Sequence, residues 1–136
     1  MHLVDTSVWI DYLRGKSNKA TDYFATLLEK GISFGLTGVI YQEILQGAKT
    51  EKDFEKLRSY LSTQYFFHPT DPVITYEAAA KLYYYCRSKG LTIRSSIDCL
   101  IAQIAIEHNL VLLHNDRDYE VIRKVAPKLA LYDELN

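Results

Sequence analysis

Short apolar runs alternate with amphipathic segments along the whole chain. The apolar runs that predict strands are 2–5, 33–37, 65–67, 110–113 and 130–132. Between them, apolar residues recur at helical spacing, which predicts helices over about 6–14, 18–30, 38–46, 51–62, 72–88, 97–108 and 119–126. Strands that alternate with helices are typical of a parallel sheet with helices on both faces, so we predict an α/β fold.

The same spacing predicts how some helices begin and which side chains they bury. Thr6 or Ser7 is expected to cap the first helix, and Ser96 the helix over 97–108. Inward positions of the first helix are predicted to be Val8, Trp9 and Leu13. In the helix over 72–88, the residues at helical spacing are Val73, Tyr76, Ala80 and Tyr84.

Four acidic residues from distant parts of the chain fall at one edge of the predicted sheet. Asp5 ends the first strand, and Asp116 lies just past the strand over 110–113. Glu43 lies about one turn into the helix after the second strand, and Asp98 lies in the first turn of another helix. Ligands of parallel sheets bind at the carboxyl ends of the strands, where the following helices begin. Each acid alone also fits a cap, a turn or a solvated helix position.

Gathered together, the four carboxylates would repel one another unless a cation neutralised them. Oxygen ligands without nearby His or Cys favour Mg²⁺ or Mn²⁺ over structural zinc. Such an ion lowers the pKa of bound water and stabilises the leaving oxygen in phosphodiester cleavage. The sequence contains no GxSxG, no P-loop and no GxGxxG after a strand, which argues against an α/β-hydrolase, an NTPase or a dinucleotide enzyme.

Composition adds few further constraints. A chain of 136 residues with 48% hydrophobic and 24% charged residues predicts one globular domain over 1–136. No apolar run approaches the ~20 residues needed to cross a bilayer, so we predict a cytoplasmic protein without a membrane segment. Cys86 and Cys99 form no CxxC pair and are predicted to be buried free thiols.

The net charge of −1 provides no overall basic field, so any attraction to nucleic acid must be local. Arg14, Lys16 and Arg94 flank segments that lead into or out of the predicted acidic site. We take these three as candidates for contacts to RNA phosphates, which position a strand without reading its sequence. Some of the 11 tyrosines could stack on unpaired bases, although most are expected in the core or at a subunit interface.

Four sequence motifs together resemble the PIN domain, and within it the VapC-type toxins of toxin–antitoxin pairs. They occur in the order found in that family and are VDTSVWI (4–10), Gln42-Glu43, SIDCLIA (96–102) and NDRDY (115–119). The resemblance implies a three-layer α/β/α fold with a mostly parallel five-stranded sheet. It also implies a Mg²⁺-dependent endoribonuclease that forms homodimers and is held inactive by a cognate VapB-like antitoxin.

By the same resemblance, Asp5, Glu43, Asp98 and Asp116 would hold the metal, and Thr6, Asn115 and Asp118 would support the site. His114 departs from the Thr or Ser common at this position, and is interpreted either as a proton-transfer group or as a local hydrogen-bonding residue. A structure-specific DNA nuclease is disfavoured because the chain has no insertion for a clamp. A non-catalytic binding module is disfavoured because all four acids are present. The sequence does not predict which RNA is cleaved.

Overall fold

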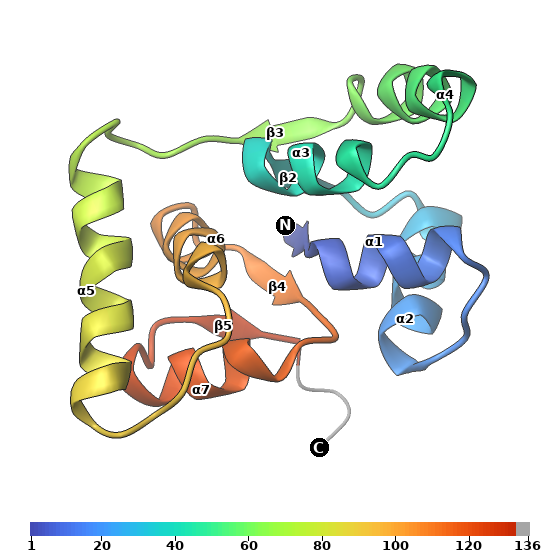
Figure 1. Cartoon of the computed structure of the whole chain (residues 1–136). Helices are drawn as coiled ribbons and strands as arrows, with labels where there is room; N and C mark the ends of the chain where they lie inside the picture. The colour runs from blue at the N-terminus through green and yellow to red at the C-terminus, as the bar shows by residue number, and fades with distance from the viewer. Residues whose placement is uncertain (133–136) are drawn as a thin grey trace.

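A computed structural model describes residues 1–132 of the chain. Residues 133–136, the end of the predicted 1–136 domain, lie outside the described part. The strands are β1 (His2–Val4), β2 (Phe34–Thr37), β3 (Tyr65–Phe67), β4 (Val111–Leu113) and β5 (Ala130–Leu131). All of them are parallel and form one five-stranded sheet in the order β3-β2-β1-β4-β5, as Figure 1 shows.

The helices are α1 (Thr6–Leu13), α2 (Lys19–Lys30), α3 (Gly38–Gln46), α4 (Glu51–Leu61), α5 (Ile74–Ser88), α6 (Ser96–Glu107) and α7 (Arg117–Val125). Each predicted helix and strand is present, with ends that differ by a residue or two. Within the described part of the chain, no helix combines the length and apolar character that crossing a membrane requires.

Two groups of helices sandwich the sheet. Helix α1 packs on α2 and α3, and α3 packs on α4, whereas α5, α6 and α7 pack on one another (Figure 1). The chain moves from β1 to β3 in one direction across the sheet and then returns to β4 and β5. Because crossovers between parallel strands are right-handed, this reversal puts the two groups on opposite faces. The predicted three-layer α/β/α fold is therefore confirmed.

The core is built on the two central strands. Leu3 and Val4 of β1 and Leu112 and Leu113 of β4 are buried on both sides of the sheet. Burial of one such side chain contributes roughly 1.5–3 kcal/mol relative to leaving it exposed. Because β1 and β4 are packed on both faces, they fix the positions of the loops that follow their carboxyl ends. Cys86 and Cys99 are buried and unpaired, as predicted.

Gly35 lets the edge strand β3 lie close to β2. A Cβ atom there would lie 2.6 Å from Cε2 of Phe67 and 2.8 Å from the carbonyl oxygen of Tyr65. Both separations are shorter than van der Waals contact. A side chain at this position would therefore push β3 away from the sheet.

The predicted inner faces of α1 and α5 were partly wrong. Leu13 is 46% exposed, because it lies in the last turn of α1, beyond the core. In α5, Val73, Tyr76, Ala80 and Tyr84 are all exposed. The buried positions of that helix are Thr75, Ala79, Leu82 and Cys86.

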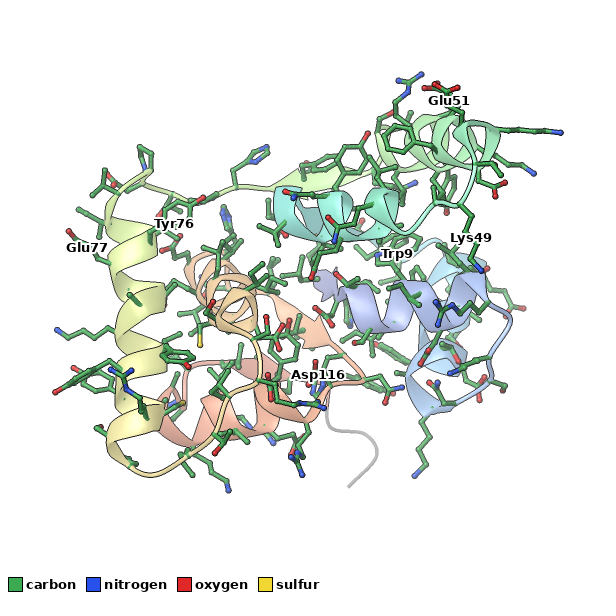
Figure 2. The ribbon with its side chains drawn as sticks, in the orientation of Figure 1. Trp9, Lys49, Glu51, Tyr76, Glu77 and Asp116 are labelled. Carbon is green, nitrogen blue, oxygen red and sulfur yellow. The ribbon has the colours of Figure 1, made fainter. Side chains whose placement is uncertain are left out.

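The difference in α5 comes from one polar contact and from side-chain size. Thr75 points inward because its hydroxyl donates to both oxygens of Glu107 at 3.0 and 2.9 Å. The small Ala79 then allows α5 to pack closely on α6. Tyrosines at helical spacing such as Tyr76 and Tyr84 are thus left exposed, and Figure 2 shows Tyr76 near the start of α5.

Two predicted helix caps were also wrong. Asp5, not Thr6 or Ser7, caps α1, because its carboxylate accepts from the backbone N–H of Ser7. Helix α6 begins at Ser96 itself, and its cap position, Ser95, makes no side-chain capping bond. The first correction matters for function, because the capping group is one of the candidate site acids.

Candidate metal centre

Asp5 and Asp116 follow two neighbouring strands at the point where the sheet changes direction. From β1 the chain continues to β2 on one side, and from β4 it continues to β5 on the other. Loops diverge at such a point and leave a crevice in which ligands of open α/β sheets bind. The backbone N–H of Asp5 donates to the carbonyl oxygen of Leu113 at 2.9 Å, which keeps the two strand ends together.

Ser7 joins the Asp5 loop to the Asn115 loop. Its hydroxyl donates to Oδ2 of Asp5 at 2.6 Å, and the same oxygen of Asp5 accepts from the backbone N–H of Ser7 at 3.0 Å. The Ser7 hydroxyl in turn accepts from the backbone N–H of Asn115 at 2.9 Å. The Asn115 side chain donates to Oδ2 of Asp11 at 2.9 Å. Asn115 thus supports the loop and is bound to α1 by two contacts.

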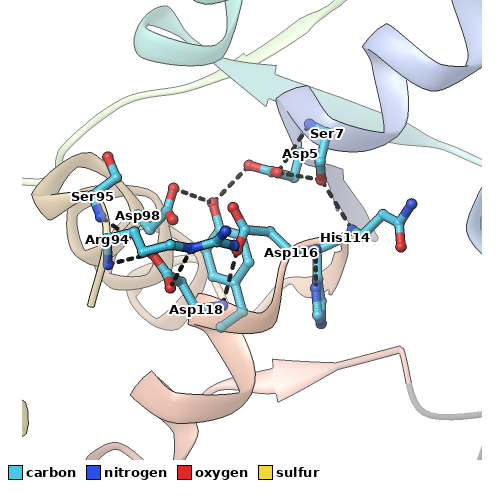
Figure 3. A network of polar contacts seen from close by, with 10 residues as sticks. Asp5, Ser7, Arg94, Ser95, Asp98, His114, Asp116 and Asp118 are labelled. Carbon is cyan, nitrogen blue, oxygen red and sulfur yellow. Dashed lines mark hydrogen bonds and ion pairs between the residues drawn. The ribbon is translucent and has the colours of Figure 1, made fainter. Parts of the chain in front are cut away.

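Asp116 and Asp118 organise the start of α7, as Figure 3 shows. Oδ1 of Asp116 caps the helix by accepting from the backbone N–H of Asp118 at 2.9 Å, and it also accepts from Arg94 at 3.1 Å. Asp118 is only 2% exposed. Its Oδ2 accepts from the backbone N–H groups of Arg94 and Ser95 at 3.0 and 3.2 Å. Asp118 therefore fixes the turn that leads into α6.

That turn delivers Asp98, which is only 8% exposed, to the same crevice. One oxygen each from Asp98, Asp116 and Asp118 lies within 4.8 Å of the others, close enough to share a metal ion. Burial, followed by the nearby carboxylates of Asp118, Asp5 and Asp116, raises the pKa of Asp98 to about 8. A cation that binds here would therefore compete with a proton for Asp98.

Tyr119 connects Asp98 to Asp5. Its buried hydroxyl donates to Oδ1 of Asp5 at 2.6 Å, and its second contact, at 3.3 Å, is Oδ1 of Asp98. A phenol has one proton, so it cannot donate to both carboxylates at once. The shorter contact, to Asp5, is therefore the main hydrogen bond, and the contact to Asp98 is the weaker one. Burial and the charges of Asp5 and Asp98 raise the pKa of Tyr119 well above its usual value.

The donor set fits a hard divalent cation. Every candidate ligand is a carboxylate oxygen, the donor type that Mg²⁺ and Mn²⁺ prefer. Oδ2 of Asp98 is buried and has no hydrogen-bond partner among the described residues. Buried polar atoms are nearly always satisfied, so an orphaned carboxylate oxygen beside two further carboxylates is compatible with a divalent cation at this position.

Glu43 lies at the margin of this group. Its Oε1 accepts from the hydroxyl of Thr6 at 2.7 Å, and Thr6 is the residue next to Asp5. Glu43 is carried by α3, whose first turn is capped by Thr37 at the carboxyl end of β2. The predicted supporting residue Thr6 therefore contacts one of the four predicted acids directly.

The three predicted phosphate contacts lie in different places. Arg94 lies on the acids themselves, paired with Asp116 and Asp118. Arg14 and Lys16 follow the last turn of α1, whereas Asp5 caps its first turn. Lys16 reaches back to Asp11 at 3.9 Å, the same residue that accepts from the Asn115 side chain. Arg14 lines the groove between α1, α3 and α4.

His114 forms its hydrogen bond with the backbone of the loop after β4 and not with a carboxylate of the crevice. Its Nδ1 accepts from the backbone N–H of Asp116 at 3.1 Å, so the ring proton resides on Nε2. Burial lowers the pKa of His114, and the nearby charges of Asp5, Glu120 and Asp116 oppose this only in part. Of the two interpretations left open by the sequence, this contact favours local hydrogen bonding.

The family model of the PIN domain matches residues 2–125. The chain belongs to the PIN domain family. This PIN domain is 36% identical over 130 residues to the VapC ribonuclease Mb1587 of Mycobacterium bovis, and equally to the ribonuclease VapC11 of Mycobacterium tuberculosis. The match covers 93% of this chain and 94% of each relative. The family predicted from the four motifs is thereby confirmed.

Solved structures of similar fold come from toxin–antitoxin complexes. VapBC2 of Rickettsia felis, bound to a DNA fragment from its promoter, has a TM-score of 0.70 at 22% identity. VapBC-1 of nontypeable Haemophilus influenzae has a TM-score of 0.70 at 19% identity. In both cases 96% of this chain and 96% of the other are covered. At such identity the likeness concerns the fold alone.

Sequence reasoning missed two contributors to this PIN domain site, Ser7 and Tyr119. Both lie inside the recognised motifs, one two residues after Asp5 and the other three residues after Asp116. Tyr119 entered the prediction only as the last residue of the NDRDY motif. The available signal was its hydroxyl, because a fully buried tyrosine usually needs a hydrogen-bond partner.

Proposed function

We propose that this PIN domain is a Mg²⁺-dependent endoribonuclease, the toxin of a toxin–antitoxin pair. The observation that carries the proposal is the buried, unpaired oxygen of Asp98 beside the carboxylates of Asp116 and Asp118. The ribonuclease names of two relatives that are 36% identical over nearly their whole length support RNA as the substrate. As an RNA-cleaving enzyme, it would act in the cytoplasm.

In this proposal Asp5, Asp98 and Asp116 hold the cation, Asp118 offers its Oδ1 as a further ligand, and Glu43 completes the acidic set from α3. Mn²⁺ is expected to substitute for Mg²⁺, since both prefer oxygen ligands. A bound cation would supply an acidified water and would stabilise negative charge on the phosphate. Asp118 holds the Arg94–Ser95 turn so that α6 presents Asp98 to the crevice.

The remaining residues of the crevice orient these acids. The Tyr119 hydroxyl and Ser7 fix the two oxygens of Asp5, and Thr6 fixes Glu43. Each of these contacts restricts a carboxylate to one rotamer before the substrate arrives. Restriction of this kind matters because catalytic groups act at full rate only when they are held in position.

The test compares cleavage of single-stranded RNA by wild type, Asp98→Asn and Asp53→Asn with and without Mg²⁺. Asp53 is an exposed acid of α4 and serves as the matched control. We expect wild type and Asp53→Asn to cleave RNA only with Mg²⁺ or Mn²⁺, and Asp98→Asn to lose at least about a hundredfold in rate. Full activity in EDTA would reject the metal mechanism, and preferred cleavage of duplex DNA would favour a DNA nuclease.

A VapB-like antitoxin is the proposed protein partner, supported by the VapBC complexes of similar fold. A groove of about 740 Å³ between α1, α3 and α4 offers it a surface. The apolar side chains of this groove are Ile10, Leu13, Ile44, Leu57 and Tyr60. Its charged lining is mainly basic, with Arg14, Lys49 and Lys56 against Asp53. Figure 2 shows Lys49 in the connection between α3 and α4.

This groove fits an amphipathic antitoxin segment with apolar residues on one side and acidic residues along its edge. A small protein encoded directly beside this gene would be the candidate antitoxin to test. We expect Lys49→Glu with Lys56→Glu to weaken its binding at least about tenfold without changing RNA cleavage. Lys128→Glu, at an exposed lysine outside the groove, is the control. Unchanged binding in the double variant would exclude this groove.

A homodimer is the proposed assembly, and α5 provides a suitable surface. Ile74, Tyr76, Tyr84 and Tyr85 of this helix and its N-cap residue Val73 are large apolar side chains that stay exposed. Monomeric proteins rarely leave so many large apolar groups together in water. Tyrosine is also enriched at interfaces, because its ring buries a large area while its hydroxyl stays hydrogen-bonded.

A further inference from the structure

The guanidinium of Arg94 lies against the acids of the crevice, and the proposed cleavage gives it no role in holding the cation. Its Nη2 lies 3.1 Å from Oδ1 of Asp116, and its Nε lies 3.6 Å from Oδ1 of Asp118 (Figure 3). No other Lys or Arg among residues 1–132 forms an ion pair with the acids of the crevice. One guanidinium therefore bridges two of the three carboxylates that lie close enough together to hold a metal ion.

We infer that the Arg94 guanidinium is an internal counterion of the metal-free protein, which a divalent cation must displace from Asp116 and Asp118. This inference rests on the proposed function, because it concerns the same site. The guanidinium and the cation compete for the same oxygens, and as positive charges they also repel each other. Arg94 consequently lowers the affinity for metal while it relieves repulsion among the acids when metal is absent.

The two carboxylate oxygens of Asp118 have different partners. Oδ2 accepts the backbone N–H groups of Arg94 and Ser95, and these contacts do not involve the Arg94 side chain. Oδ1 is the oxygen that the guanidinium approaches. If the guanidinium swings away, the turn before α6 stays anchored through Oδ2, and Oδ1 becomes available. Displacement of Arg94 therefore leaves the position of Asp98 unchanged.

The Arg94 side chain can leave at little cost. It is 64% exposed, whereas the side chains of Asp116 and Asp118 are 27% and 3% exposed. An exposed arginine regains its hydration when it turns into solvent, and such ion pairs contribute little to stability. The acids are the buried partners, so they lose most when the pair breaks without a replacement cation. This difference in burial favours replacement of the guanidinium by a metal ion over loss of the ion pair without a replacement.

Calorimetric titration with Mn²⁺ tests this exchange in wild type, Arg94→Gln and Arg94→Lys. Arg58→Gln is the matched control, since Arg58 also pairs with an acid, Glu55, but on the surface of α4. We expect Arg94→Gln to bind Mn²⁺ about three- to fivefold more tightly than wild type, the range of an exposed ion pair. Arg94→Lys keeps the charge and should bind within about twofold of wild type, as should Arg58→Gln.

Thermal unfolding gives a second readout that does not depend on activity. We expect metal-free Arg94→Gln to melt below wild type, because the acids lose their counterion, and to gain more in Tm than wild type from saturating Mn²⁺. Equal or weaker Mn²⁺ binding by folded Arg94→Gln would overturn the counterion role and leave the metal site standing. If none of the proteins binds Mn²⁺, both this inference and the proposed function fail.

Discussion

The hydroxyl of Tyr119 donates a 2.6 Å hydrogen bond to Oδ1 of Asp5, which lies 114 positions away in the chain. Tyr119 is fully buried in the first turns of α7, and Asp5 caps α1. The bond therefore joins the two helices that begin beside the crevice, one from each layer. It also turns one oxygen of Asp5 toward Asp98, which contacts the same hydroxyl.

Tyr119→Phe removes this hydroxyl while it keeps the ring in the core. Loss of a buried hydrogen bond to a charged group is expected to cost about 1.5–3 kcal/mol of unfolding free energy. We expect RNA cleavage to fall roughly tenfold, because Asp5 loses one of the contacts that orient it. Urea unfolding and initial cleavage rates measure the two effects.

Tyr65→Phe is the control for that experiment, because Tyr65 is exposed on the edge strand β3. Its stability should stay within about 0.5 kcal/mol of wild type, as for most surface substitutions. Wild-type stability and cleavage in Tyr119→Phe would show that the bond to Asp5 has no part in the site.

The fold and the shared sheet edge of Asp5 and Asp116 could be predicted because both follow from local patterns, whereas the close approach of Asp98, Asp116 and Asp118 depends on tertiary contacts. Alternating strands and helices predict a parallel sheet, and a parallel sheet brings Asp5 and Asp116 to one edge. The hydroxyl contact of Tyr119 was not predictable, since nothing in the spacing of α7 indicates which buried side chain lies opposite. The inner face of α5 was missed for the same reason, because Thr75 is turned inward by Glu107 of another helix.

The contribution of Asp98 to the stability of the metal-free protein should fall as pH rises from about 4 to about 8. Folding raises the pKa of Asp98 from 3.8 to about 8, mainly through burial, so between these values the folded state binds more protons than the unfolded state. The contribution of Asp98 to the free energy of unfolding then decreases with pH. The full cost of burying its ionised carboxylate is present above about pH 8. Asn is isosteric with the protonated carboxyl and carries no such penalty.

We therefore expect metal-free Asp98→Asn to exceed wild type in unfolding free energy by about 1–2 kcal/mol at pH 8, and by clearly less at pH 5. Urea unfolding at the two pH values in EDTA measures the gap. Asp53→Asn, at an exposed acid of α4, should track wild type at both. A gap that is the same at pH 5 and pH 8 would mean that Asp98 does not titrate across this range.

Thr6 is expected to affect RNA cleavage by holding the carboxylate of Glu43 in position. Thr6→Val keeps the shape of the side chain but removes the donor that lies 2.7 Å from Oε1 of Glu43. We expect cleavage to fall about five- to tenfold, corresponding to the loss of one hydrogen bond of about 1 kcal/mol. Thr6→Ser retains the hydroxyl and should restore most of the rate. If Thr6→Val cleaves as fast as Thr6→Ser, Glu43 does not depend on this contact.

The outer face of α5 gives the last prediction. Tyr76 and Tyr84 are 51% and 57% exposed on this helix, and we expect both to be buried in the homodimer. Tyr76→Glu with Tyr84→Glu would place two charges in that interface, so the dimer dissociation constant should rise at least about a hundredfold. Sedimentation velocity at micromolar concentration should then detect monomers. Phe54→Glu, at an exposed aromatic residue of α4, should leave the dimer intact. A stable dimer in the double variant would move the interface to another face of the domain.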